Sequence, residues 1–298
     1  MNAASPSEHP SGVRSRRRST VLLALSSFLF AMMAVAAKES SQRLPGAEVA
    51  CLRFVIGALT VGLFSLFGLR LRPHSLSVLL LRGLLGSGAV LLYFVAIAHL
   101  PVGVATLLNN SSPLFVAAFS WLFLGEPLLA RTLWAFLLTT AGVLMVVLGN
   151  SPLGGGRSLD LRYMLLGLGS AVLAGGAVTT IRAMRRREGS WEIFFAFCVI
   201  GALVTAVPTA YQFVWPTRRD AFWIAMTGLF SSAYQVMMTY SLKDVPAVQA
   251  GLLLQLTPIA TFAFGALWLG ELPSLLGWLG AALTIFGVCW GLLVPAKK

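Results

Sequence analysis

The chain has 298 residues, of which 57% are hydrophobic and only 11% are charged, whereas about 25% of the residues in a typical soluble domain are charged. Its net charge of +12 is also common in nucleic-acid-binding proteins, but here the basic residues lie at the ends of long apolar runs and not on a soluble scaffold. Composition therefore excludes a soluble domain and a nucleic acid partner, and it predicts a protein embedded in a lipid bilayer.

Ten apolar runs follow one another along the chain, each close to the roughly 20 residues that a helix needs to cross a bilayer. Residues 1–18 before them are polar and rich in Ser, Pro and Arg, and we expect a disordered basic tail there. The predicted spans are 19–37, 47–69, 76–97, 103–124, 130–149, 161–183, 191–212, 220–241, 247–269 and 273–294.

The distribution of Lys and Arg predicts the orientation of these spans. If the spans alternate in direction, most of the 22 Lys and Arg residues fall on the side of the N-terminus, with a dense group in the connection 182–188. Basic residues accumulate in cytoplasmic loops. We therefore expect a multi-pass protein of a bacterial-type inner membrane, with both termini in the cytoplasm.

The sequence matches itself at a shift of 145 residues. Pro113 then aligns with Pro258, and Gly142 aligns with Gly287. With one residue of slippage upstream, 55–59 and 199–203 are identical over five positions. The match predicts a duplication, with a first repeat over 19–149, a connection over 150–160, a second repeat over 161–294 and a short tail over 295–298.

Each repeat holds five spans, and an odd number means that the second repeat enters the membrane from the opposite side. The predicted fold is thus an all-α membrane protein of ten transmembrane helices, arranged as two inverted five-helix repeats around a central cavity. Secondary transporters commonly have this organisation, with the binding site between the repeats near the bilayer midplane.

The pattern resembles the EamA family of the drug/metabolite transporter superfamily. The resemblance lies in the ten spans, in the segment Asn110-Ser111-Ser112-Pro113 followed by Gly125-Glu126, and in its echo Gln255-Leu256-Thr257-Pro258 followed by Gly270-Glu271. It covers about residues 19–294, and it implies a basket-like helix bundle with a central cavity. The resemblance also implies export of small molecules, and amino acid export recurs among the bacterial members.

Polar side chains in the fourth and ninth spans are candidate substrate ligands, because polar groups within membrane helices usually face the protein interior or a water-filled cavity. They are Asn109, Asn110 and Ser111 in the fourth span and Gln255 in the ninth. Pro113 and Pro258 follow them, and each proline is expected to kink its helix and to act in gating. The alternative is that these amides only bond neighbouring helices.

Further candidates come from aromatic and basic residues. Tyr234 and Gln235 share a helical face in the eighth span, and Tyr93 shares one with Gly86 and Val90 in the third. These residues are candidates to line the cavity, and anchoring at the membrane interface is the alternative for the tyrosines. Lys38 and Arg53 lie near the outer ends of the first two spans. There they either attract a substrate carboxylate or extend to the headgroups, and the second interpretation is favoured for both and for Arg82.

The ten acidic residues all fall outside the spans or at their ends. We therefore expect no buried carboxylate to carry protons, and transport driven by a membrane potential or a gradient, or facilitated flux, fits better. The chain also has no GxxxxGK[ST] motif.

These features predict a secondary transporter that exports amino acids, aromatic or other neutral ones among them, and related small polar metabolites by alternating access. Transport of riboflavin, nucleosides or drugs is the main alternative, and a channel or a membrane-embedded enzyme is a distant one. We expect no enzymatic activity, no cofactor and no metal site. A monomer and a homodimer both remain open.

Overall fold

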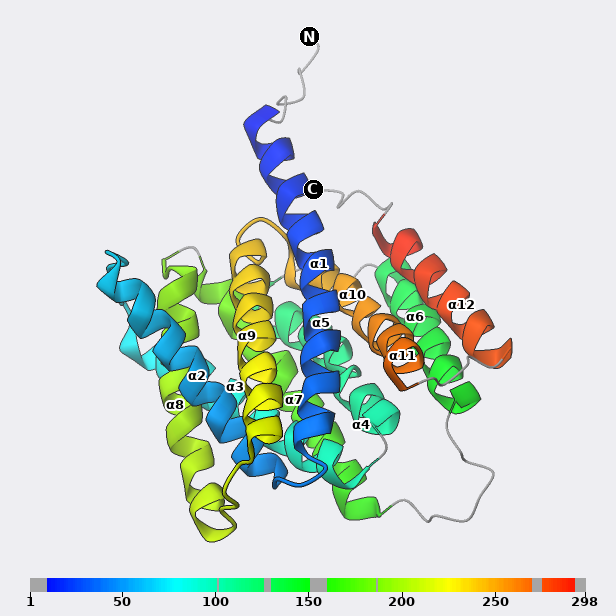
Figure 1. Cartoon of the computed structure of the whole chain (residues 1–298). Helices are drawn as coiled ribbons and strands as arrows, with labels where there is room; N and C mark the ends of the chain where they lie inside the picture. The colour runs from blue at the N-terminus through cyan, green and yellow to red at the C-terminus, as the bar shows by residue number, and fades with distance from the viewer. Residues whose placement is uncertain are drawn as a thin grey trace.

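The computed structural model describes residues 10–100, 102–125, 130–150, 160–185, 187–269 and 275–292. This part of the chain folds into a helical bundle (Figure 1). Its helices are α1 (Pro10–Ser40), α2 (Gly46–Leu66), α3 (Leu76–His99), α4 (Val102–Asn109), α5 (Ser112–Leu124), α6 (Ala130–Asn150), α7 (Leu161–Met184), α8 (Ser190–Tyr211), α9 (Arg218–Ser241), α10 (Ala247–Leu254), α11 (Leu256–Leu269) and α12 (Leu275–Leu292).

Two of the predicted spans are broken helices. The fourth span consists of α4 and α5, and the ninth consists of α10 and α11. Each break lies just before a proline, at Asn110 and Ser111 ahead of Pro113 and at Gln255 ahead of Pro258. Proline lacks an N–H group, and its ring collides with the preceding turn. Each of these two spans is therefore interrupted at the polar residues that precede its proline.

Five helices, α1, α2, α3, α7 and α8, are long and apolar enough to cross a membrane, and the described residues include shorter apolar helices as well. Large apolar side chains cover the outside of the bundle, among them Leu59, Leu203 and Trp268, with exposed fractions of 67%, 68% and 64%. So many exposed apolar side chains suit contact with lipid and not with water.

The first helix is longer than predicted. We expected a disordered tail over 1–18, but α1 begins at Pro10. Its early residues contact the second repeat: Ser15 and Ser19 donate hydrogen bonds to Asp244, at 2.9 and 2.8 Å, and Arg16 donates to Gln249 at 2.8 Å. Composition alone does not reveal these contacts, which extend the helix toward the N-terminus, ahead of the predicted span. Residues 1–9 and 293–298 lie outside the described part, as do Glu126 and Glu271.

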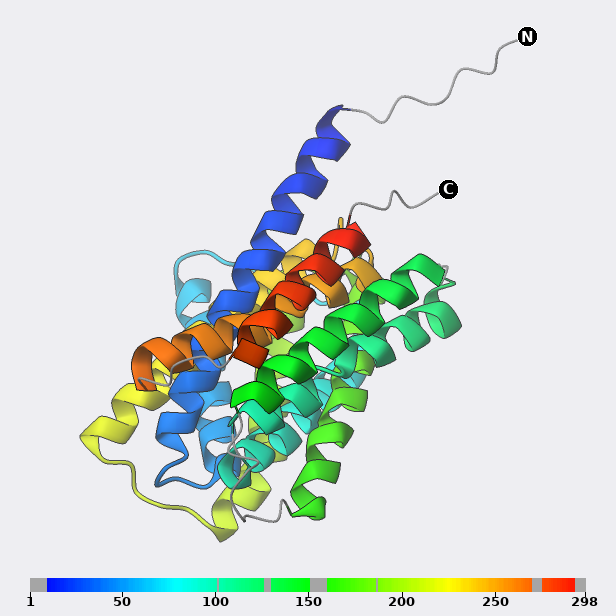
Figure 2. The same cartoon turned by 90° about the vertical axis from the view of Figure 1, so that its right-hand side faces the viewer.

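The contacts between the two repeats are reciprocal. The first span of each repeat packs on the third span of the other, as α1 on α9 and α7 on α3, while α2 packs on α8. The last spans, α6 and α12, lie side by side (Figure 2). Repeat-equivalent partners pair in this way when a duplicated chain folds around an approximate two-fold axis.

The α6–α12 contact depends on two glycines. A Cβ atom at Gly142 would lie 2.6 Å from the backbone nitrogen of Thr284, and one at its repeat equivalent Gly287 would lie 2.9 Å from that of Thr139. Only glycine allows these two backbones to approach so closely, as small residues often do between membrane helices.

Candidate functional site

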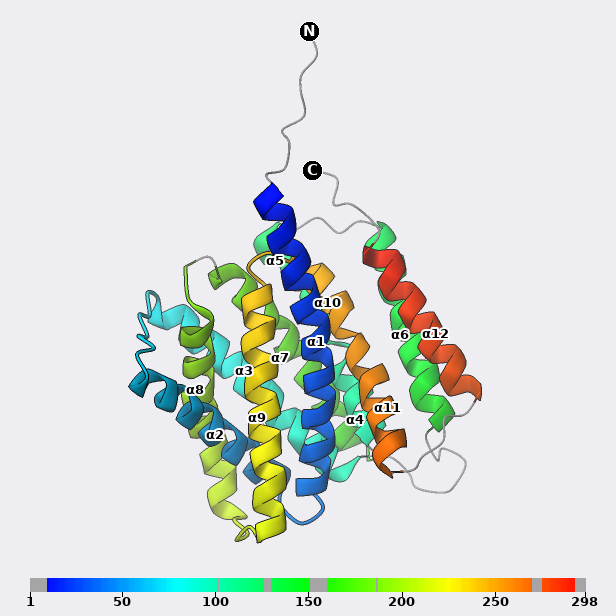
Figure 3. The ribbon, with the colours of Figure 1, turned by 45° about the horizontal axis from the view of Figure 1, so that its top comes forward.

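A cavity lies between the repeats, where the broken helices meet the long spans. Its lining comes from both halves of the chain, from α1, α2, α3, α4 and α5 on one side and from α7, α8, α9, α10 and α11 on the other; Figure 3 shows α1, α9 and the α10–α11 segment side by side. Six of the predicted site residues line it, namely Arg53, Tyr93, Asn109, Asn110, Tyr234 and Gln235.

Arg53 is not where the sequence placed it. We favoured a side chain that extends to the headgroups, but Arg53 is only 3% exposed. Its guanidinium carbon lies 4.7 Å from the ring centroid of Phe54 and 5.7 Å from that of Phe197, and its Nη1 donates to Met33 Sδ at 3.4 Å. The expectation was wrong because α8 packs over this face of α2 and covers the side chain.

Arg82 was likewise expected at the membrane surface and is instead 2% exposed within the cavity lining. Its Nη2 donates to Gln235 Oε1 at 3.3 Å, and its guanidinium carbon lies 4.2 Å from the Phe197 centroid. Gly86, one turn later on α3, makes room for it, since a Cβ atom there would collide with Arg82 Nη1. The neighbouring α8 and α9 thus keep this guanidinium inside the protein.

Aromatic rings form one wall of the cavity. Phe30 on α1 lies between the two predicted tyrosines, with centroids 6.0 Å from Tyr93 and 4.9 Å from Tyr234. The Tyr93 hydroxyl is 3.1 Å from Thr106 Oγ1, and the Tyr234 hydroxyl donates to Met238 Sδ at 3.1 Å. The rings thus link α1, α3 and α9 to α4, which is the first half of the broken fourth span.

The amide groups divide between the cavity and the helix break. Asn109 Nδ2 donates to Ser170 Oγ at 3.0 Å, and Asn110 Nδ2 donates to the Thr106 carbonyl at 2.8 Å. Gln255 is fully buried but does not line the cavity. Its Nε2 donates at 3.1 Å to the carbonyl of Asn110, its own repeat equivalent, so it joins the two broken helices to each other.

The remaining predicted residues lie outside the cavity lining. Ser111 caps the end of α4, where its Oγ donates to the Leu108 carbonyl at 2.6 Å. Lys38 Nζ donates to the carbonyls of Ile97 and Leu100, at 3.0 and 3.4 Å, and so satisfies the C-terminal end of α3. Pro113 and Pro258 follow the breaks and are absent from the lining.

Arg182, at the end of α7, makes the contacts that correspond to those of Lys38 in the first repeat. Its Nη1 donates to the carbonyls of Leu242 and Lys243, at 2.7 and 2.9 Å, at the end of α9. Cations at a helix C-terminus interact favourably with the exposed carbonyls and the helix dipole. Both side chains therefore support helix ends in the structure.

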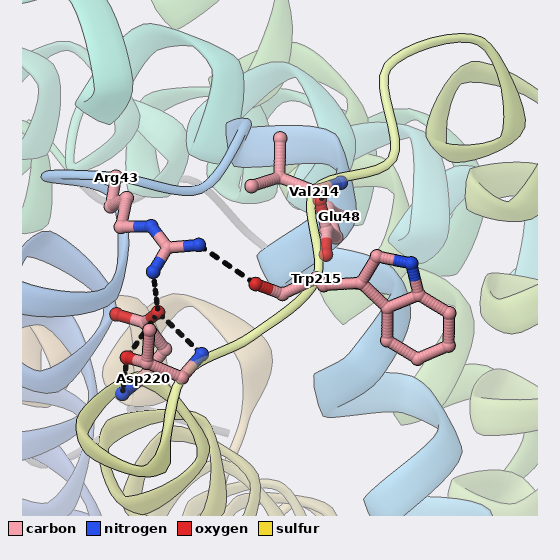
Figure 4. A network of polar contacts seen from close by, with 6 residues as sticks. Arg43, Glu48, Val214, Trp215 and Asp220 are labelled. Carbon is pink, nitrogen blue, oxygen red and sulfur yellow. Dashed lines mark hydrogen bonds and ion pairs between the residues drawn. The ribbon is translucent and has the colours of Figure 1, made fainter.

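A polar network joins the connection between α1 and α2 to the connection between α8 and α9 (Figure 4). Arg43 contacts Asp220 at 3.3 Å and donates to the Trp215 carbonyl at 2.8 Å. Glu48, fully buried in the first turn of α2, accepts from the backbone nitrogen of Val214 at 3.0 Å.

The repeat equivalent of Glu48 is Glu192, which accepts a hydrogen bond from the backbone nitrogen of Arg72 at 3.1 Å. Each glutamate thus binds the backbone of a connection in the other repeat, and these two connections are equivalent in the duplication. Neither belongs to the cavity, and no carboxylate lies among the described residues that line it.

Sequence reasoning missed several lining residues, among them Arg82, Met33, Phe197 and Thr257. Arg82 was within reach, because it lies four residues before Gly86 and eleven before Tyr93, on the helical face already assigned to the cavity. Phe197 gave no such signal, since an apolar side chain in an apolar span looks the same whether it faces lipid or the interior.

Comparison with known proteins agrees with this architecture. The chain is 35% identical to the pseudopaline exporter CntI of Pseudomonas aeruginosa, over 90% of this chain and 94% of that protein. It is 27% identical to a probable terminal-alkyne amino-acid exporter of Streptantibioticus cattleyicolor, over 74% of each chain. A crystal structure 22% identical in sequence shares the fold, with a TM-score of 0.77 over 93% of this chain and 99% of the other.

The family model of the EamA-like transporters matches this sequence twice, over residues 18–148 and 161–293. The two matches cover both five-span repeats, so the resemblance noted from the sequence is confirmed. The chain belongs to the EamA-like transporter family.

Proposed function

We propose that this transporter is a secondary carrier that exports amino acids and related small polar metabolites by alternating access. The observation that carries the proposal is the cavity between the repeats, with guanidinium, amide and hydroxyl groups set among aromatic rings. Such a site suits a small molecule with both polar groups and an apolar part. Of the two relatives named above, one is the pseudopaline exporter and the other is named as a probable terminal-alkyne amino-acid exporter.

Inverted repeats are part of the proposal. In Figure 1, α1 runs down the page from the N-terminal end, whereas α7 starts at the bottom and runs upward. Opposite courses of equivalent helices allow the two halves to exchange conformations, which opens the shared site to one side and then to the other. The breaks ahead of Pro113 and Pro258 are natural hinges for this motion, because few backbone hydrogen bonds join the helix ends there.

The proposed location is the inner membrane, with both termini in the cytoplasm, and it rests on the Lys and Arg distribution. The start of α1 and the end of α12 lie at the same end of the bundle, which supports an even number of spans (Figure 3). Among the alternatives, a cationic drug fits the cavity poorly, because two buried arginines would repel it.

The test is counterflow in proteoliposomes that contain the purified protein. Vesicles are loaded with single unlabelled amino acids from a broad panel, and the entry of a radiolabelled one is measured. Saturable, exchange-stimulated entry is expected for a carrier. Entry that increases linearly with concentration would indicate a channel, and no entry of any amino acid into vesicles that hold folded protein would refute amino acid transport.

A further inference from the structure

We propose that the cavity selects molecules with at least two anionic groups, carboxylates in the first place, one held by Arg53 and one by Arg82. The inference rests on the proposed transport function, because it names the class of molecule that is carried. It goes beyond the neutral amino acids that the sequence favoured.

The first support is the number of hydrogen-bond donors left without a partner. Arg53 Nε, Arg82 Nε and Arg82 Nη1 are buried and have no hydrogen-bond partner in the structure. Both side chains line the cavity and are more than nine-tenths buried. A buried ion is unfavourable unless an opposite charge and further hydrogen bonds compensate it, and inside a membrane protein such residues mark substrate pathways.

The second support is the absence of a counter-charge. The groups that contact the two guanidiniums are the rings of Phe54, Phe94 and Phe197, the sulfur of Met33 and the amide oxygen of Gln235. Aromatic faces and an amide dipole stabilise a cation only in part. No Asp or Glu stands among the lining residues in the described part of the chain, so the negative charge must come from the cargo.

The geometry suits two anionic groups on one molecule. The guanidinium carbons lie 5.7 Å and 4.2 Å from the same ring centroid, that of Phe197. They are therefore at most 9.9 Å apart, the sum of those two distances. Each guanidinium binds a carboxylate well because its N–H groups match the two oxygens. A neutral amino acid brings one carboxylate together with an ammonium group, and it would leave the second arginine uncompensated.

Both arginines come from the first repeat. At the 145-residue shift Arg82 aligns with Thr227, and with the one-residue slippage Arg53 aligns with Phe197. The cationic pair is thus a specific addition to a duplicated scaffold, and the backbone of the fold does not require it.

The first experiment measures the melting temperature of the full-length protein in detergent with glycine, iminodiacetate and nitrilotriacetate, which carry one, two and three carboxylates on a single amine. We expect a rise with the last two compounds and none with glycine. Arg53→Met and Arg82→Met should abolish the rise, and neither should melt below the wild type when no compound is added, because each removes an uncompensated buried charge. Arg82→Lys should keep part of the rise.

Arg187→Met is the matched control, since Arg187 is exposed in the connection after α7 and its variant should respond as the wild type does. An equal rise with glycine, a full rise in both cavity variants, or no rise with either iminodiacetate or nitrilotriacetate would overturn the proposal. A marked loss of stability in both methionine variants would overturn it too, because the arginines would then support the fold.

The same compounds are then used in counterflow with radiolabelled iminodiacetate. We expect the half-saturating concentration to increase at least tenfold in each methionine variant. If the melting shifts depend on the arginines but no counterflow occurs, the anion site stands and the transport function fails. If neutral amino acids exchange equally well in the wild type and in both variants, transport stands and the inference of a site for two anionic groups fails.

Discussion

Gly142 and Gly287 are expected to allow the close packing of α6 against α12, and replacing either with alanine tests this. A Cβ atom at Gly142 would lie 2.6 Å from Thr284 N and 2.7 Å from the Gly280 carbonyl oxygen, whereas non-bonded contacts are optimal at about 3.5–4.0 Å. The colliding atoms belong to the backbone, so the helices must separate by about 1 Å. Overpacking of this kind costs about 1–3 kcal/mol.

The assay is thermal unfolding of the purified variants in detergent. Gly62→Ala is the control, because Gly62 lies on α2 with nothing within 4 Å of the added Cβ atom. This substitution raises helix propensity by about 1 kcal/mol, as the other two do, without a collision. Relative to it, Gly142→Ala and Gly287→Ala should both melt lower, by about 2–4 °C for each kcal/mol. If all three variants melt together, the close approach of α6 and α12 contributes nothing and the reasoning is refuted.

Three further predictions concern the site and the helix ends. Gly86→Ala should displace the flexible end of Arg82, so the half-saturating substrate concentration should increase while the melting temperature changes little; an unchanged transport curve would contradict this. Lys38→Met and Arg182→Met should each destabilise the protein by about 1–3 kcal/mol through the carbonyls left unpaired, with unchanged substrate affinity in counterflow; a loss of affinity at normal stability would instead place either residue in the site. Asn109→Ala should lower transport without unfolding the protein, which circular dichroism and counterflow together would check, and normal transport would remove Asn109 from the candidate ligands.

The helices and their duplication could be predicted well from the sequence. Bilayer thickness restricts the length of each span, and equivalent prolines recur at the same positions in both repeats. The amide motif was located for the same reason: Asn110 and Gln255 precede equivalent prolines, and the structure places both at helix breaks. Their separate contacts were beyond sequence reasoning. Gln255 bonds the carbonyl of Asn110, and this contact exists only once the two repeats have packed.

The buried arginines show the opposite limit. An Arg near the end of an apolar span has two solutions, to extend toward the headgroups or to turn inward, and local sequence does not separate them. What decides is the partner helix: Phe197 of α8 lies against both guanidiniums. The start of α1 was mispredicted for a related reason, since its polar residues find partners at Asp244 and Gln249 in distant segments.

The placement of both arginines in one repeat has a consequence for how such a protein can be assembled. Two copies of the first repeat, paired as a symmetric dimer, would put four guanidiniums into a single cavity, because every residue of a two-fold pair appears twice. Their mutual repulsion at low dielectric would exceed what surrounding aromatic rings offset. Joining the repeats in one chain removes that constraint: Phe197 and Thr227 occupy the two equivalent positions, and the number of charges in the cavity is free to match the cargo.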